Sequence, residues 1–209
     1  MRWFALAVWL AGLGFPALAD ALAVGRLGEL LAGVRYLQAD FEQQLTDANG
    51  AVMQQTEGTL LLSHPSRFRW STQPPFEQLV VSDGQTVWQY DPDLMQVVVR
   101  PLDKRADQIP SLLLGGDIDA VSAHYSVTEL PASENGGAVR FRLEPLQDST
   151  LFTALELGFL NGRIHELLIA DGFEQLTRIR FIEPRMLETS DDSLFVFEPP
   201  ANADVIYDE

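Results

Sequence analysis

Residues 37–50 read LQADFEQQLTDANG, and this stretch decides the fold class. Apolar side chains at Leu37, Ala39, Phe41 and Leu45 alternate with polar ones, which is the period-two pattern of a strand with one buried face. The Asn49-Gly50 pair that follows is typical of a hairpin, because a type I′ turn needs positive φ at both central residues. The stretch therefore predicts an antiparallel hairpin.

The same pattern continues along most of the chain. Further turn pairs lie at Asp83-Gly84, Asn135-Gly136, Asn161-Gly162 and Asp171-Gly172. Runs rich in β-branched and aromatic residues separate the turns, at 59–63, 67–71, 78–82, 86–90, 96–100, 125–128, 139–143, 151–159, 163–170, 176–182 and 194–197. The pattern predicts a meander of about 10–11 antiparallel strands in one domain, residues 20–209.

Two segments have a helical pattern instead. Between Asp20 and Leu37, apolar residues spaced three and four apart form one stripe. Between Asp103 and Ala123, Pro110 precedes a leucine run that ends in Gly115-Gly116, which predicts a short helix, with a second one at 118–122. We therefore expect about three helices.

A single sheet of this length curls, and so few helices cannot cover both of its faces. We expect a mainly β chain with a helical lid (α+β), in which a strongly curved antiparallel sheet forms an incomplete barrel with the helices on its concave side. Phe68 and Trp70 alternate with Arg67 and Arg69, so this strand has one apolar face and one charged face. Periodicity leaves open whether the apolar face lines a filled core or a ligand cavity.

Composition narrows the function classes. The chain of 209 residues has 14 basic and 30 acidic side chains, a net charge of -16 and no cysteine. Such acidity argues against nucleic acid and anionic membrane surfaces as partners. The lack of cysteine excludes disulfides, thiolate chemistry, cysteine zinc sites and a lipid attached through cysteine.

The first 19 residues predict a secretory signal peptide. Arg2 gives a positive start, an apolar run ends at Pro16, and Ala17-Leu18-Ala19 is an A-x-A cleavage site before Asp20. The apolar run is too short for a comfortable membrane span, so we expect an exported mature protein.

The sequence contains no catalytic motif. His64, His124 and His165 have no metal-ligand spacing, and there is no GxSxG elbow, Walker A sequence or GxGxxG. The abundant carboxylates leave a glycosidase-like Asp/Glu pair open. We expect no enzyme, no catalytic residue, no metal and no cofactor.

Several motifs, in this order and spacing, resemble the LolA family of periplasmic outer-membrane lipoprotein carriers over essentially the whole mature chain. They are Asp40-Phe41-Glu42-Gln43, Gly58-Thr59-Leu60, Pro65 with Phe68 and Trp70, Val81-Ser82-Asp83-Gly84, Val87 to Leu94, Ile109 to Leu113, Phe195 to Pro200 and Asp204-Val205-Ile206.

The resemblance implies a fold and a function. The family's fold is an unclosed antiparallel barrel with a lid of three helices. Its members take triacylated lipoproteins from an inner-membrane ABC transporter, LolCDE, shield the acyl chains across the periplasm and pass the cargo to an outer-membrane receptor, LolB. By this resemblance we expect acylated lipoproteins as cargo, a periplasmic location and a monomer.

The resemblance also suggests site residues. Phe68 matches a cavity phenylalanine of the family, although it could equally be ordinary core. With it we assign to the cargo cavity Trp70, Leu79, Val81, Leu112, Leu113 and Phe141.

One position departs from the family pattern. Where the family has an arginine before this proline, which holds the lid closed, the chain has His64 before Pro65. Imidazole offers fewer donors and no fixed charge, so lid closure would be weaker or would depend on pH near about 6.5. His64 is therefore a candidate lid latch, with an ordinary polar strand-end residue as the alternative.

Two other functions stay open from the sequence. The same shape could carry another amphiphile, such as a glycolipid or a fatty acid. An enzyme acting on acyl substrates is a third reading, without a visible nucleophile–base motif to support it.

Overall fold

The computed structural model describes residues 16–102, 118–131, 138–147, 152–189 and 191–208. One continuous sheet dominates them. Its strands are β1 (Tyr36–Thr46), β2 (Val52–Ser63), β3 (Arg67–Thr72), β4 (Gln78–Asp83), β5 (Thr86–Asp91), β6 (Gln96–Pro101), β7 (Tyr125–Leu130), β8 (Ala138–Pro145), β9 (Ala154–Leu160), β10 (Arg163–Ala170), β11 (Leu176–Met186) and β12 (Asp204–Tyr207).

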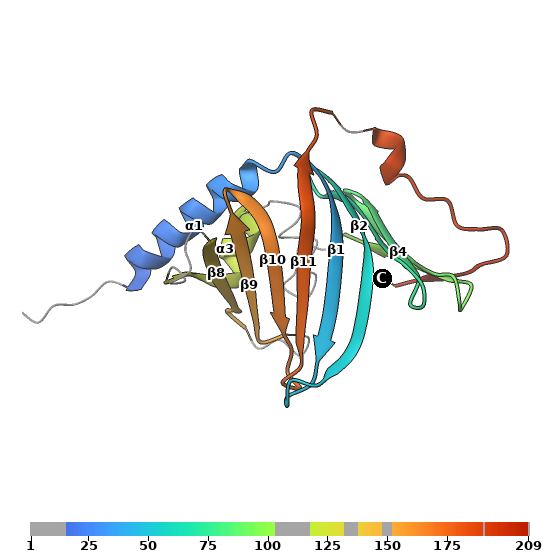
Figure 1. Ribbon diagram of the computed structural model, residues 1–209. Coiled ribbons are helices and arrows are strands. Elements are labelled where there is room, and N and C mark those ends of the chain that lie inside the picture. The colour runs from blue at the N-terminus through green and yellow to red at the C-terminus, as the bar shows by residue number, and fades with distance from the viewer. Residues whose placement is uncertain (1–15, 103–117, 132–137, 148–151, 190, 209) are drawn as a thin grey trace, which may run out of the picture.

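The sheet is curved and unclosed, with the strand order β12-β6-β5-β4-β3-β2-β1-β11-β10-β9-β8-β7 (Figure 1). From β1 to β6 and from β7 to β11, neighbours along the chain pair antiparallel, and β1 also pairs with β11, for example Phe41 with Phe181. This pairing joins an N-terminal half, β1 to β6, to a C-terminal half, β7 to β11, so the predicted meander is confirmed as one sheet.

The described residues form 12 strands, which exceeds the predicted 10–11, and one predicted strand is wrong. Residues 194–197 are not a strand: residues 194 and 195 belong to a 3-10 helix, η2 (Asp192–Phe195), which follows its cap Asp191. The extra strand, β12, pairs parallel with β6. Strands β6 and β12 are far apart in the sequence and are not joined by a hairpin turn. The sequence pattern therefore gave no signal for this parallel pair.

The expectation of about three helices is not confirmed. The described residues contain two α-helices, α1 (Pro16–Ala32) and α3 (Ile118–His124), besides η2. Helix α3 confirms the predicted helix at 118–122, whereas the one expected after Pro110 lies outside the described residues. The N-terminal helix ends at Ala32 rather than at Leu37, because residues 36 and 37 already pair with β2.

Both α-helices cover the same face of the sheet, over its C-terminal half, where α1 contacts β7 and α3 (Figure 1). Leu27 and Leu31 of α1 and Val121 of α3 join one core cluster with Phe141 and Phe181 of the sheet. Burial of each such side chain contributes roughly 1.5–3 kcal/mol. We call the face that carries Phe41 and Phe181 the inner face, and the opposite face the outer face.

The predicted turn chemistry is confirmed in part. At Asn161-Gly162 both residues have positive φ, 52° and 74°, as a type I′ turn requires. At Asn49-Gly50 only Gly50 does, with φ 79°. There the Asp47 carboxylate accepts from the amides of Asn49 and Ala51, at 2.9 and 2.8 Å, and closes a longer turn.

No helix within the described ranges is both long and apolar enough to cross a bilayer.

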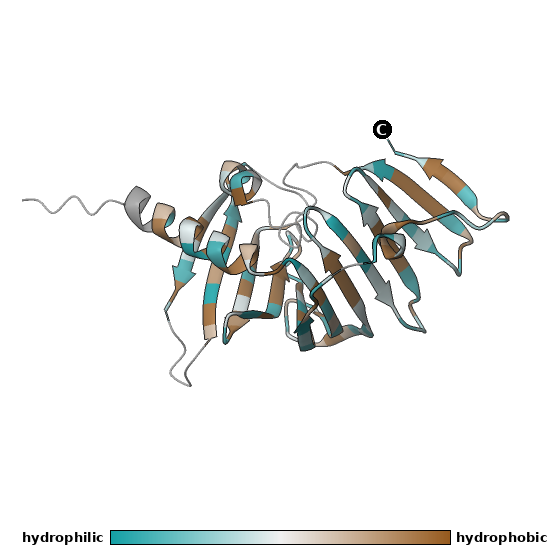
Figure 2. Cartoon of the chain, turned by 90° about the horizontal axis from the view of Figure 1, so that it is seen from above, coloured by the Kyte–Doolittle hydropathy of each residue, from teal (hydrophilic) through white to brown (hydrophobic). Residues whose placement is uncertain are grey.

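Hydrophobic residues run along strands of both halves of the sheet (Figure 2). They also occur on strands that α1 and α3 do not cover.

Candidate functional site

The strand register decides which side chains face inward. On β3, Trp70 pairs with Leu60 of β2 and Val80 of β4, and Phe68 pairs with Leu62 and Ser82. Since directly paired residues share a face, Phe68, Trp70 and Val80 lie on the inner face, the one that α1 and α3 cover farther along.

Trp70 is held in place by an aromatic stack. Its ring centroid lies 3.9 Å from that of Phe41, and the two planes are 28° apart. Gly58, which pairs with Phe41, makes this possible: a Cβ there would overlap the Phe41 ring and the carbonyl oxygen of Ser71. Glycine at this position therefore lets two aromatic rings lie flat on the sheet.

The inner face is apolar beyond the helices as well. In the C-terminal half, Phe141 and Leu157 are completely buried under the helices. In the N-terminal half, Trp70, Val80 and Val98 point to the same side but are only half-buried. This partly open apolar surface is the candidate site, because it can shield apolar groups without requiring directional bonds.

A pocket of about 230 Å³ opens at one end of this surface. Trp70 and Phe76 supply aromatic wall, and Thr56 lies among the lining residues with its hydroxyl buried and without a hydrogen-bond partner in the described part of the chain. The remaining lining side chains are polar: Gln43, Gln54, Thr72, Glu77, Gln78, Asp91 and Asp93.

The structure brings only some of the predicted cavity residues together. Phe68 and Trp70 are neighbours on the inner face, and Phe141 lies on that face in the covered half. Leu79 and Val81 lie on the outer face, paired with Ser71 and Arg69.

Two of the predicted residues, Leu112 and Leu113, lie outside the described residues.

The sequence analysis assigned Leu79 and Val81 to the cavity, but both lie on the outer face, for a simple reason. The run Leu79-Val80-Val81 is apolar throughout, so its sequence cannot indicate which face points inward.

Val81 is nevertheless fully buried, because the C-terminal segment covers the outer face there. η2 contacts β3 and β4, and Phe195 is buried under the Arg67 guanidinium, 5.4 Å from its ring centroid. Arg67 also pairs with Asp192 at 2.6 Å, and Arg69 donates to the carbonyl of Leu194 at 3.4 Å. Both arginines thus contact the C-terminal segment. They lie on the face opposite Phe68, as the sequence predicted.

His64 lies between β2 and β3, half-buried. Its backbone amide donates to the carbonyl of Arg35 at 2.9 Å, which joins this turn to the link between α1 and β1. The predicted latch residue is therefore close to the chain segment that follows helix α1.

Sequence reasoning missed a cation on the inner face. Arg100 pairs with Val87 of β5, and Val87 pairs with Ser82, so all three face inward. The Nε of Arg100 is buried without a hydrogen-bond partner within the described ranges. Alternation along residues 96–101 puts Arg100 and the buried Val97 on opposite faces of β6. No sequence motif indicated that Arg100 belongs to the candidate site.

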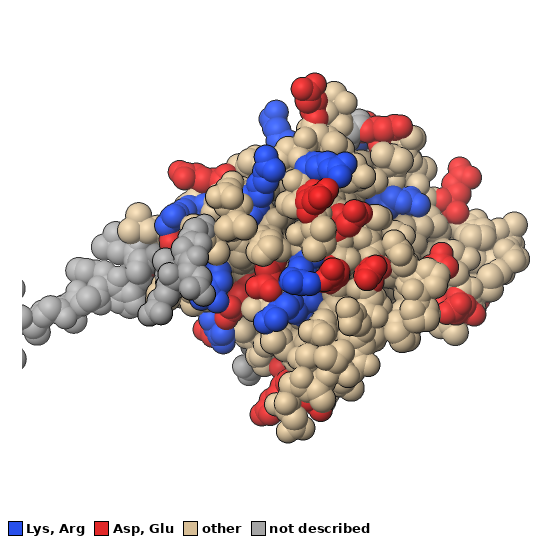
Figure 3. Space-filling view, in the orientation of Figure 1, with Lys and Arg blue, Asp and Glu red and all other residues tan. Residues whose placement is uncertain are grey.

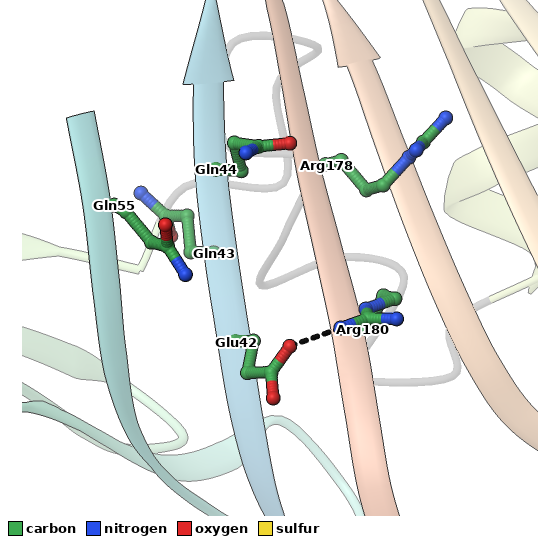
Figure 4. A pocket seen from close by; sticks show the side chains of 6 residues that line it. All are labelled: Glu42, Gln43, Gln44, Gln55, Arg178 and Arg180. Carbon is green, nitrogen blue, oxygen red and sulfur yellow. Dashed lines mark hydrogen bonds and ion pairs between the residues drawn. The ribbon is translucent and has the colours of Figure 1, made fainter. Parts of the chain in front are cut away.

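The outer face of the C-terminal half is charged instead of apolar, with basic and acidic side chains interspersed over it (Figure 3). Arg180 pairs with Glu42 across a shallow pocket lined only by charged and amide side chains (Figure 4). Arg142 contacts Glu144 at 2.9 Å and Glu156 at 3.1 Å, and the Glu144 hydrogen bond raises the pKa of Arg142. This face is unsuited to hydrocarbon.

No group of three or more metal-ligating side chains occurs in the described part of the chain.

Comparison with known proteins identifies the family that this chain resembles. A family model described as "Outer membrane lipoprotein carrier protein LolA" matches residues 32–198. The outer-membrane lipoprotein carrier protein of Azotobacter vinelandii is 42% identical over 191 residues, 91% of each chain. That of Chromohalobacter salexigens is 42% identical over 198 residues, covering 94% of this chain and 93% of the relative.

Solved structures share the fold at low identity. An uncharacterized conserved protein from Thermus thermophilus matches with a TM-score of 0.56 at 15% identity, over 90% of this chain and 98% of that one. A DUF1329 family protein from Desulfovibrio piger matches with a TM-score of 0.53 at 11% identity, over 88% and 98%.

Proposed function

The chain belongs to the LolA family of outer membrane lipoprotein carrier proteins, and from this membership we propose how it works: it is a periplasmic chaperone that binds the acyl chains of outer-membrane lipoproteins on its inner face. The observation that supports this site is the half-open apolar surface of Trp70, Val80 and Val98, which lies beside the buried Phe68 and next to a helix-covered core.

This surface suits a reversible carrier. Hydrocarbon exposed to water costs roughly 0.8 kcal/mol per CH₂, so an acyl chain must be shielded in transit. Contacts with apolar side chains are non-directional, and the cargo can leave without breaking a network of hydrogen bonds. Arg100 lies on the same face, and its Nε, which has no hydrogen-bond partner among the described residues, would donate to an ester carbonyl of the cargo.

The route is also part of the proposal. Signal peptidase would cleave after Ala19 and leave Asp20 as the first residue. Asp20 accepts from the amide of Val127 at 2.8 Å, so the new N-terminus would stay attached to β7. The carrier would receive cargo from the inner-membrane ABC transporter LolCDE and deliver it to the outer-membrane receptor LolB, working as a monomer. It would perform no reaction of its own.

Mass spectrometry of the protein purified from periplasm tests the cargo class. We expect co-purified peptides that carry an acylated N-terminal cysteine. A discrete glycolipid or free fatty acid in their place would contradict the proposal and favour the amphiphile carrier. Turnover of short-chain esters by the purified protein would contradict the non-enzymatic part.

The latch role of His64 needs its own experiment. Because a guanidinium offers more donors than an imidazole, His64→Arg should hold the empty carrier closed more firmly and lower the binding of a hydrophobic dye. Lipoprotein transfer should change with it. If neither dye binding nor transfer changes, His64 is not a latch.

A further inference from the structure

Four connections between strands follow one another along one edge of the sheet, and each has an exposed, large hydrophobic side chain within it or, for Met53 at the start of β2, beside it. They join β5 to β6, β3 to β4, β1 to β2 and β10 to β11, which are consecutive pairs in the sheet order. The side chains are Leu94, Phe76, Met53 and Phe173, with 68%, 51%, 57% and 79% of their surface exposed. We call these four residues with their turns the tip surface.

The opposite edge of the sheet is built differently. Its three described turns, residues 64–66, 84–85 and 161–162, contain only polar residues, proline and glycine. Single exposed hydrophobics are ordinary, but a row of them on neighbouring turns marks an interaction site. The opposite edge also exposes Leu160 and Met186, at the ends of β9 and β11, but only 39% and 40% of their surface, so the more exposed row is the candidate binding surface.

The tips are held in position before any partner binds. The Asp171 carboxylate accepts from the amide of Phe173 at 2.8 Å, and the Asp91 carboxylate accepts from that of Leu94 at 3.0 Å. The Thr72 hydroxyl donates to the carbonyl of Phe76 at 2.8 Å. Ordered turns lose less conformational entropy on binding, which favours a docking role.

The charge around the tips defines the partner. Residues 47–53, 73–77, 91–95 and 171–175 contain no lysine or arginine and six carboxylates: Asp47, Glu77, Asp91, Asp93, Asp171 and Glu174. Such a surface is repelled by anionic lipid and complements a protein face with basic residues around apolar pockets.

We infer that the tip surface is a docking site for a partner protein whose face is apolar at its centre and basic at its rim. The pocket between Phe76 and Asp93, with Trp70 in its wall, opens among the same turns, so docking would place the partner at the end of the inner face. The identity of this partner as a membrane protein that gives or takes the cargo rests on the proposed function.

The test compares two variants of the mature protein. One carries Met53→Ser, Leu94→Ser and Phe173→Ser. The matched control carries Leu160→Ser, Ile182→Ser and Met186→Ser, which are exposed hydrophobics elsewhere on the sheet. Binding to the purified transporter LolCDE in detergent, to the soluble domain of LolB and to phosphatidylcholine vesicles with and without phosphatidylglycerol is measured for each.

We expect the tip variant to lose at least about tenfold in affinity for LolCDE or LolB while the control binds like the wild type. Asp93→Lys with Glu174→Lys should weaken the same complex, and salt should weaken the wild-type complex between about 50 and 300 mM. Unchanged binding of the tip variant to both proteins would overturn the inference. So would a tip-dependent binding to vesicles, or a tip-dependent dimer of the carrier itself.

Binding of a synthetic triacylated peptide separates the two proposals. The tip variant should bind this peptide as the wild type does, because its three substitutions lie outside the pocket and the inner face. Failure of the wild type to bind it would count against the carrier function and leave the docking result to stand alone.

Discussion

At the scale of single residues, the direction of a side chain decides its role. Val80 and Leu79 are adjacent on β4 and both are half-buried, but Val80 pairs with Trp70 on the inner face and Leu79 with Ser71 on the outer face. The sequence predicted the inward direction of Phe68 and Trp70 because arginines alternate with them. It could not do so for the uninterrupted apolar run of β4, where the strand register supplies the answer.

This pair offers a direct prediction. Val80→Gln puts an amide where hydrocarbon should bind, which costs about 1–3 kcal/mol, so affinity for an acylated peptide should fall about tenfold. Leu79→Gln should change it by less than about twofold, since the side chain faces away from the cargo. Isothermal titration with one acyl-peptide checks both. Equal losses in the two variants would show that the inner face is not the binding surface.

At the scale of elements, the C-terminal segment gives the sheet a second covered region. Phe195 fills the outer face beside the fully buried Val81, and Phe197 lies 6.0 Å from the Tyr90 ring. The sequence indicated hydrophobic residues here, which we predicted as a strand. The tertiary environment decides otherwise: Asp191 caps a 3-10 turn, and the strand forms only at β12.

Packing of the C-terminal segment can be tested by a neighbouring pair. Phe195→Ala should lower the free energy of unfolding by about 3 kcal/mol, because it leaves a cavity under Arg67. Val196→Ala should lower it by less than about 0.5 kcal/mol, since Val196 is largely exposed. Urea unfolding measures both values. A small effect at Phe195 would show that this segment does not stabilise the sheet.

The cap of η2 predicts a dependence on acid. Hydrogen bonds from the Ser193 side chain and backbone amide to Asp191 lower the pKa of this carboxyl below 3.8. Because the folded pKa is the lower one, the stabilisation is complete above the ordinary value and is lost as the pH falls through the folded value.

Unfolding of the wild type and Asp191→Asn should therefore be compared at pH 6 and pH 3. The difference in stability between the two proteins should shrink at the lower pH. A difference that stays constant would mean that the Asp191 charge does not stabilise the cap.

At the scale of the whole molecule, the acidic excess is unevenly distributed. The outer face of the C-terminal half pairs its arginines with glutamates, whereas the tip surface holds carboxylates alone. Net charge is readable from the sequence, but its distribution depends on which turns meet at one edge. The curved single sheet was predictable from alternation and strand number; the parallel β12 was not, because no local signal encodes it.

Lipoprotein release from membranes tests the central claim most directly. Inner-membrane vesicles with the transporter and a newly acylated outer-membrane lipoprotein are incubated with ATP and the mature protein, and the soluble fraction is analysed by size-exclusion chromatography. We predict that the lipoprotein leaves the membrane only when the protein is present and elutes with it as an equimolar complex. A lipoprotein that stays in the vesicles, while the Azotobacter vinelandii carrier releases it under the same conditions, would contradict the account.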